Sequence, residues 1–172
     1  MKNKKVLYIT NAGVIAAMYV ALTFLSNLFG LAYGAVQFRL SELLCILPLF
    51  TPAAIPGLTI GCVLANLNSP FGVVDIVFGS LATLIGAVLT YLLRKVTVKK
   101  LPLLSMFMPV LANAVIVGAE ITFFAEESGS KLLLFLYNFA TVGLGELVMC
   151  VALGIPFYYL IQKTGVFSKY RK

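Results

Sequence analysis

The sequence predicts an all-α integral membrane protein: a single domain, residues 1–172, with six transmembrane helices and both termini in the cytoplasm. Hydrophobic residues make up 61% of the chain and charged residues 11%, against roughly 45–50% and about 25% in soluble domains. A soluble domain of this length cannot bury so much apolar surface, and the same composition excludes intrinsic disorder. Histidine is absent, which excludes imidazole catalysis and the commonest metal ligand.

Basic residues flank the apolar runs rather than covering one face of the protein. The formal net charge is +7, and the Lys and Arg residues gather mainly at 2–5, 94–100 and 163–172. This is the positive-inside pattern of a multi-pass protein of a bacterial plasma membrane. Nucleic-acid binding would need a basic face with base-reading groups, so we expect the lipid bilayer, and no nucleic acid, as a partner.

The lengths of the apolar runs set the predicted spans. Crossing a bilayer takes about 20 residues, whereas the apolar core of a signal peptide has roughly 7–15; the first run therefore predicts a retained span. The spans are predicted at residues 6–29, 38–50, 53–67, 73–93, 102–124 and 132–161. With six spans, all three basic clusters lie on the inner side, whereas five would leave one cluster outside.

The connections between the spans follow from turn residues. Residues 30–37 predict a loop or a re-entrant segment, and residues 66–72 are dense in turn formers. Pro102 is a favoured first-turn proline for the fifth span, and residues 125–130 form a polar outer loop. The second and third spans are short, so either they thin the bilayer or part of that stretch is re-entrant.

Four acidic residues fall inside or at the rim of apolar runs, where an ionisable group costs roughly 2.5–3.5 kcal/mol. Polar groups from several spans share the outer half of the membrane, which predicts a ligand pocket open to the outside. Because carboxylates outnumber cations there, the ligand should offer N–H donors or an amine. The predicted substrate-binding residues are Phe38, Arg39, Glu42, Phe71, Asp75, Asn113, Glu120, Tyr137, Asn138 and Glu146.

Structural roles remain open for several of these residues. Arg39 and Glu42, three residues apart, would also suit an ion pair closing a helix end. Asp75 would suit a helix N-cap. Asn113 and Asn138 would suit hydrogen bonds between membrane helices.

Tyr137 would also fit the aromatic belt at a membrane interface. Cys45, Cys62 and Cys150 form no CxxC pair and lie in apolar runs, so we expect them to be small buried hydrophobes. No metal site is predicted.

The first span carries small residues at four-residue spacing. They form two rows, Ala12/Ala16 and Gly13/Ala17/Ala21. Such rows let another helix approach closely. They predict either a docking face for a partner protein or ordinary packing within the chain.

Several strings resemble one family of membrane carriers. They are QFRLSE at 37–42, TPAAIPG at 51–57, DIVFGSLATL at 75–84, PVLAN at 109–113 and GLGE at 143–146. Over most of the chain these resemble the QueT family of queuosine-precursor carriers, a family of S components of energy-coupling factor (ECF) transporters.

This resemblance implies a substrate-binding subunit of an ECF-type importer that takes a 7-deazaguanine (preQ0, preQ1 or queuine) from outside. The subunit would deliver it inward after docking, through the small-residue rows, on a transmembrane T component with two ATPase subunits. Glu120 or Glu146 would accept from the ligand N1–H and amino group, and Phe38, Phe71 or Tyr137 would stack on the ring. The chain has no GxxxxGK[ST] loop, so we expect no enzymatic activity and no cofactor of its own.

A second interpretation is a stand-alone secondary transporter coupled to protons or cations, because such carriers use membrane carboxylates as relays. No inverted repeat is visible in the six predicted spans. A membrane enzyme is disfavoured because the sequence shows no metal cluster and no nucleophile with a base partner.

Overall fold

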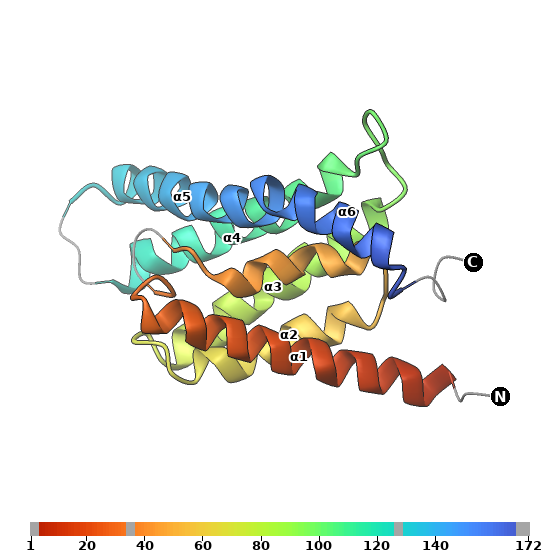
Figure 1. Ribbon diagram of the computed structural model, residues 1–172. Coiled ribbons are helices and arrows are strands. Elements are labelled where there is room, and N and C mark those ends of the chain that lie inside the picture. Colours follow the sequence, from red (N-terminus) through yellow and green to blue (C-terminus); the bar gives the residue numbers. More distant parts are fainter. Residues whose placement is uncertain (1–3, 34–36, 126–128, 168–172) are drawn as a thin grey trace.

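The computed structural model describes residues 4–33, 37–125 and 129–167, and within these ranges the regular elements are helices, apart from one isolated bridge between Val98 and Leu101. The chain runs back and forth along one bundle, with α5, η2 and α6 following one another in one direction as its last pass (Figure 1). They are α1 (Lys4–Leu28), the 3₁₀ helix η1 (Leu40–Leu49), α2 (Ala54–Asn66), α3 (Val73–Leu93), α4 (Leu103–Phe124), α5 (Lys131–Leu147), the π-helical turn η2 (Val148–Ala152) and α6 (Gly154–Thr164).

Four helices are long and apolar enough to cross a membrane: α1, α3, α4 and the continuous stretch Lys131–Thr164 formed by α5, η2 and α6. The predicted second and third spans correspond to η1 and α2, which are apolar but shorter. The all-helical fold is therefore confirmed, and the lengths and composition of four helices suit membrane spans, whereas six spans with cytoplasmic termini stay a prediction.

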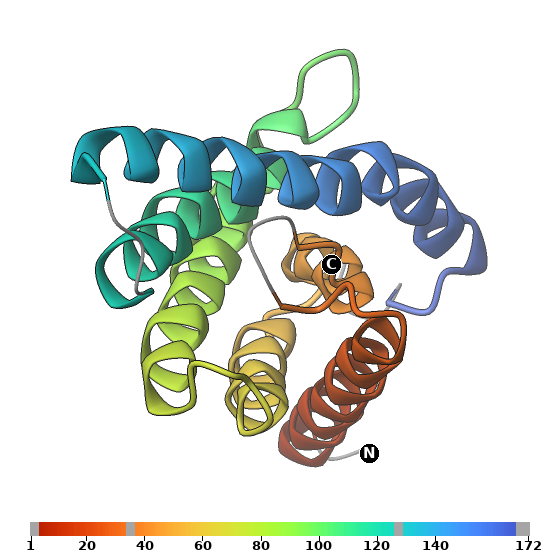
Figure 2. The same ribbon diagram turned by 90° about the vertical axis from the view of Figure 1, so that its left-hand side faces the viewer.

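The 3₁₀ helix η1 lies inside the bundle, as the end-on view in Figure 2 shows. It contacts α1, α2, α3, α4, α6 and η2, and seven of its ten residues are buried. A 3₁₀ helix rises about 2.0 Å per residue against about 1.5 Å in an α-helix. Ten residues therefore reach about 20 Å, which partly compensates for a short segment. Pro48 lies one residue before the end of η1, where its missing N–H removes one backbone hydrogen bond from the last turn.

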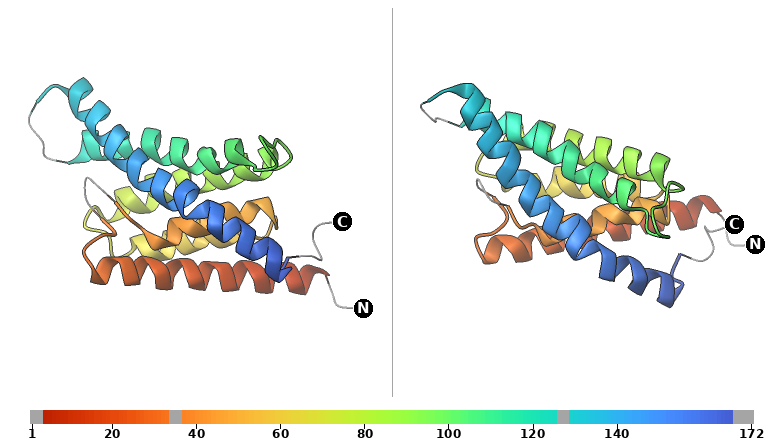
Figure 3. Two further views of the ribbon diagram at one scale, coloured as in Figure 1. Left: turned by 45° about the horizontal axis from the view of Figure 1, so that its top comes forward. Right: turned by 90° about the horizontal axis from the view of Figure 1, so that it is seen from above.

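The last helical stretch crosses the bundle obliquely (Figure 3). Its 34 residues span about 51 Å at 1.5 Å per residue, against a hydrocarbon core of about 30 Å. A helix this long must tilt or extend beyond the core. The π-helical turn η2 interrupts it near its centre and carries the buried Cys150.

Helix α1 packs very closely on α2 through glycines. A Cβ at Gly61 would lie 2.7 Å from Tyr19 Cβ and 3.0 Å from the Ala16 carbonyl oxygen, and a Cβ at Gly57 would lie 2.8 Å from the Ala12 carbonyl oxygen. The row Ala12/Ala16 is therefore used for packing within the chain, one of the two uses predicted for such rows.

The second row points away from the bundle. Gly13, Ala17 and Ala21 are exposed, and a Cβ at Gly13 would meet nothing within 4 Å. This exposed row is the part of the predicted docking face that remains available to another protein.

The two ends of the bundle differ. At the basic end, where α1 begins and α3 and α6 finish, lie Lys5, Lys163 and the turn at Lys99 and Lys100 (Figure 1). Those two turn residues have φ of 49° and 70°, as a two-residue hairpin turn requires. At the opposite, distal end α1 finishes, α3 begins and α4 joins α5.

Candidate ligand-binding site

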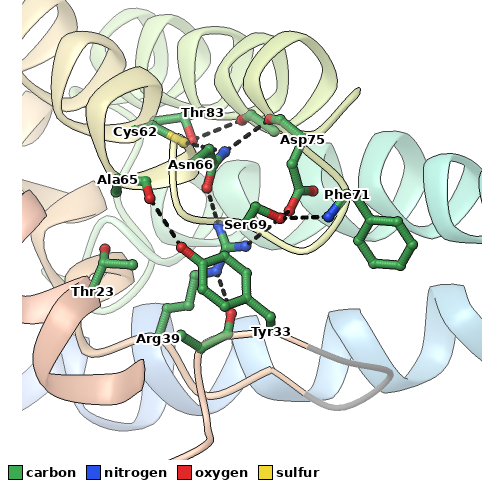
Figure 4. Close-up of polar contacts among 12 residues, drawn as sticks. Thr23, Tyr33, Arg39, Cys62, Ala65, Asn66, Ser69, Phe71, Asp75 and Thr83 are labelled. Carbon is green, nitrogen blue, oxygen red and sulfur yellow. Dashed lines mark hydrogen bonds and ion pairs between the residues drawn. The ribbon is translucent and has the colours of Figure 1, made fainter. Parts of the chain in front are cut away.

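Arg39 is the centre of a buried polar cluster at the distal end. It directly precedes η1, and its Nε donates to the Ala32 carbonyl oxygen at 2.6 Å. Its Nη1 donates to Asn66 Oδ1 at 3.3 Å, and its Nη2 lies 3.9 Å from Asp75 Oδ2 (Figure 4). The guanidinium therefore ties the segment before η1 to the end of α2 and the start of α3.

Asn66 and Ser69 hold the start of α3 against the end of α2. The fully buried Asn66 donates from Nδ2 to the Asp75 carbonyl oxygen at 2.8 Å. A Cβ at Gly79 would lie 2.7 Å from that Nδ2, so glycine makes the room. The Ser69 hydroxyl donates to the Asp75 carboxylate and accepts from the Phe71 N–H. Asp75 thus acts as an acceptor in this cluster and not as a side-chain N-cap of α3.

Tyr33 closes the cluster from the loop after α1. The guanidinium carbon of Arg39 lies 4.9 Å from the centre of its ring, and its hydroxyl donates to the Ala65 carbonyl oxygen at 3.0 Å. Burial raises the pKa of Tyr33 above its usual value near 10. The hydroxyl therefore stays protonated at neutral pH and remains a donor.

A second set of buried groups lies deeper, around Glu42 of η1. Its carboxylate accepts from the Tyr19 hydroxyl and from Cys45 Sγ at 3.0 Å. Cys150 Sγ lies 3.3 Å from the Glu42 carbonyl oxygen and 3.5 Å from Glu146 Oε2. All three cysteines are buried, as predicted, and these two thiols also act as weak hydrogen-bond donors.

The sequence left open an ion pair between Arg39 and Glu42. The structure does not contain this ion pair among the residues that it describes. Arg39 pairs with Asp75 on another helix, whereas Glu42 is held by Tyr19 and Cys45.

Glu120 enters the same region from α4, about one turn before that helix ends. It is 2% exposed, and neither of its carboxyl oxygens has a hydrogen-bond partner among the described residues. Its carboxyl group approaches that of Asp75 without a well-formed hydrogen bond and interacts electrostatically with Arg39. Glu120 is therefore an acceptor with no donor.

Three predicted site residues lie apart from this cluster. Tyr137 is 56% exposed on the outer face of α5. Asn138 lies buried between α4 and α5, where its Nδ2 donates to Thr122 Oγ1 at 3.1 Å, as expected for a hydrogen bond between membrane helices. Asn113 donates to the Pro109 carbonyl oxygen within its own helix.

The two predicted stacking residues differ in position. Phe38 is half-buried directly before Arg39, and its N–H donates to the Leu31 carbonyl oxygen at 2.9 Å. The ring of Phe71 points away from Arg39 (Figure 4). Phe38 therefore adjoins the cluster in the chain, whereas the Phe71 ring does not face Arg39.

Comparison with known proteins identifies the family. A family model described as QueT transporter matches residues 9–163. The chain belongs to the QueT transporter family. A relative from Lactococcus lactis subsp. cremoris (strain MG1363), described as Queuosine precursor transporter QueT, is 40% identical over 85 residues. That alignment covers 49% of this chain and 50% of the relative, so the chain spans about half the length of the curated relative it matches. No solved structure matches the chain.

Apart from the cysteines, four side chains of the two buried sets in this QueT-family chain lie outside the predicted set: Tyr33, Asn66 and Ser69 of the cluster and Tyr19 of the deeper set. Tyr19 lies three and seven residues after Ala16 and Ala12, on the same face of α1, so helical spacing places it toward α2. Ser69 belongs to a turn, and the sequence gives no sign that its hydroxyl bonds the Asp75 carboxylate. Among the described residues, no group of His, Cys, Asp and Glu side chains is arranged to hold a metal ion.

An apolar groove of about 320 Å³ lies between α1 and α6, with η1 at its base. Val14 and Met18 of α1 line one wall, and Phe157 and Leu160 of α6 line the other. At 100° per residue, Val14 and Met18 neighbour the exposed row Gly13/Ala17/Ala21 on α1. The row and the groove therefore form one continuous apolar surface, which we call the α1 face.

Proposed function

We propose that this chain is the substrate-binding membrane subunit of an ECF-type importer, capturing a 7-deazaguanine queuosine precursor outside the cell. Membership of the QueT transporter family and the description of the Lactococcus relative support the substrate class. The observation that carries the proposal is the buried cluster of Arg39, Asp75 and Glu120 at one end of an apolar bundle. A lipid-embedded protein keeps such groups chiefly where they bind or move a solute.

The proposed orientation follows from the basic residues. Lys and Arg favour the cytoplasmic side of multi-pass proteins, and the basic end carries Lys5, Lys163, Lys99 and Lys100. The basic end and both termini then face the cytoplasm of a bacterial cell, and the distal cluster faces the outside.

The composition of the cluster suits a ligand rich in N–H donors. Arg39 is the one cation at the cluster among the described residues; it donates to Ala32 and Asn66 and is paired with Asp75. The carboxylates left beyond that pair accept hydrogen bonds and favour donors or cations. The Tyr33 ring lies beside the cluster, 4.9 Å from the guanidinium carbon of Arg39, and stacking of a base on an aromatic ring contributes about 1–3 kcal/mol.

Energy would come from partner proteins. We propose that the α1 face docks on a transmembrane T component that carries two ATPase subunits, because small exposed residues let a partner helix approach closely. The neighbouring groove would take larger apolar side chains of that partner. Exposed leucines elsewhere on the bundle, such as Leu132 and Leu144, are not part of a small-residue row beside the groove. These leucines would face lipid.

Uptake of radiolabelled preQ1 tests this function. Cells producing the chain with a T component and ATPases should accumulate preQ1, and cells lacking the ATPases should not. Uptake that survives without the ATPases and collapses with an ionophore would overturn the importer proposal and support a stand-alone secondary transporter. Ala17→Leu should abolish uptake while ligand binding persists. Ala140→Leu, the same change at an exposed position of α5, is the matched control and should transport normally.

A further inference from the structure

We propose that Glu120 is the residue that recognises the donor edge of the ligand, accepting from both the ring N–H and the exocyclic amino group of a 2-aminopyrimidinone ring. In the same proposal Arg39 is a positioning residue. This inference rests on the proposed function and assigns the specificity contact within that site.

Burying the Glu120 carboxylate is energetically unfavourable unless a hydrogen-bond donor binds to it. A buried polar group without a hydrogen bond is destabilised by several kcal/mol relative to water, and such groups in native proteins are rare. Glu120 is 2% exposed, and both of its oxygens lack partners among the described residues. A carboxylate has two oxygens side by side and can accept two parallel N–H donors.

Among the described residues, no donor pair contacts Glu120. Arg39 donates from Nε to Ala32 and from Nη1 to Asn66 and forms its ion pair with Asp75, and none of its nitrogens hydrogen-bonds Glu120. The nearby Asp75 brings a second carboxylate, which repels Glu120 unless a proton or a donor lies between them. A ligand that inserts a planar edge of N–H groups beside Glu120 would remove both problems at once.

Glu146 is the alternative that the sequence left open, and its surroundings differ. Its carboxylate lies 3.5 Å from Cys150 Sγ and interacts with Glu42 at the junction of η1 and η2. It is therefore already part of the deeper set of groups held by thiols and by Tyr19. Glu120 remains the acceptor at the distal cluster with no donor of its own.

The test compares two ligands and two variants by isothermal titration in detergent. 7-Deazaguanine has the ring N–H and the amino group, and 7-deazahypoxanthine has the ring N–H alone. Losing one charge-assisted hydrogen bond corresponds to about 10- to 100-fold in affinity. Wild-type protein should bind 7-deazaguanine about 10- to 100-fold more tightly than 7-deazahypoxanthine. In Glu120→Gln this preference should fall to about threefold or less, because an amide offers one acceptor and opposes the amino group with its own donors.

Glu146→Gln is the matched control and should keep the wild-type preference. Without ligand, Glu120→Gln should unfold at the same temperature as wild type or higher, since the change removes an unpartnered charge; this separates a contact role from misfolding. The inference is overturned if Glu120→Gln weakens both ligands equally, or if the preference is lost in Glu146→Gln instead. If wild-type protein binds neither these compounds nor preQ1, the proposed function itself fails.

Discussion

The ion pair between Arg39 and Asp75 makes a quantitative prediction about stability. Its nitrogen and oxygen are 3.9 Å apart, and the two side chains are 8% and 4% exposed. At an effective dielectric constant of 20, opposite charges at this distance attract by about 4 kcal/mol. Arg39→Met keeps the apolar stem but leaves Asp75 buried without its cation, which costs about 3–5 kcal/mol. At about 2–4 °C per kcal/mol for a chain of this size, the melting temperature should fall by about 6–20 °C.

A double-mutant cycle read by thermal unfolding in detergent isolates the pair. Asp75→Asn leaves the guanidinium unpaired and should also destabilise the protein. The double variant should lose at least about 1 kcal/mol less than the sum of the single variants, because groups in contact couple by about 0.5–3 kcal/mol. Arg94→Met, at a half-buried arginine near the basic end, should cost under about 1 kcal/mol, as for a surface charge. Additive single effects, or an Arg39→Met variant as stable as Arg94→Met, would refute a stabilising ion pair between Arg39 and Asp75.

Three further substitutions test the packing. Ala16→Leu should lower the free energy of unfolding by about 1–3 kcal/mol, measured by thermal unfolding, because Ala16 packs on Gly61; a neutral effect would contradict the α1–α2 contact. Gly145→Ala should weaken preQ1 binding measured by titration, since its Cβ would overlap the Gln37 carbonyl oxygen and displace the segment before η1; unchanged affinity would contradict that contact. Tyr137→Ala should leave preQ1 affinity within about twofold of wild type, and a large loss would place Tyr137 in the site.

The helical segments were predictable because lipid imposes simple rules on them. Apolar runs bounded by Pro, Gly or charge must form helices to satisfy their backbone groups. The predicted span at 73–93 matches α3, and the one at 102–124 differs from α4 by one residue. The 3₁₀ form of η1 and the π turn η2 were not predictable, because they depend on how a short segment fits among its neighbours and not on hydropathy.

The candidate site was predictable in its residue types but not in its pairings. Buried charges in apolar runs are visible in a sequence, so Arg39, Asp75 and Glu120 were found. Spacing of three along a helix favoured Glu42 as the partner of Arg39, yet Arg39 lies just before η1 in extended backbone, and the start of α3 brings Asp75 to it. Which residue contacts which depends on tertiary packing.

The small-residue rows show the same limit. Both rows of α1 have equal four-residue spacing, and only the position of α2 shows that Ala16 faces inward and Ala17 outward. Helix packing in membranes uses small residues both within a chain and between chains. Composition alone therefore cannot distinguish the two uses.

Mass spectrometry of small molecules released from the purified protein tests the central claim most directly. The protein should be extracted in mild detergent from cells grown with a mixture of preQ0, preQ1 and queuine, and then denatured. We expect one of these 7-deazaguanines at close to one molecule per chain, and its loss from Glu120→Gln protein that remains folded. Release of a different class of solute at that ratio, with no 7-deazaguanine, would contradict the account.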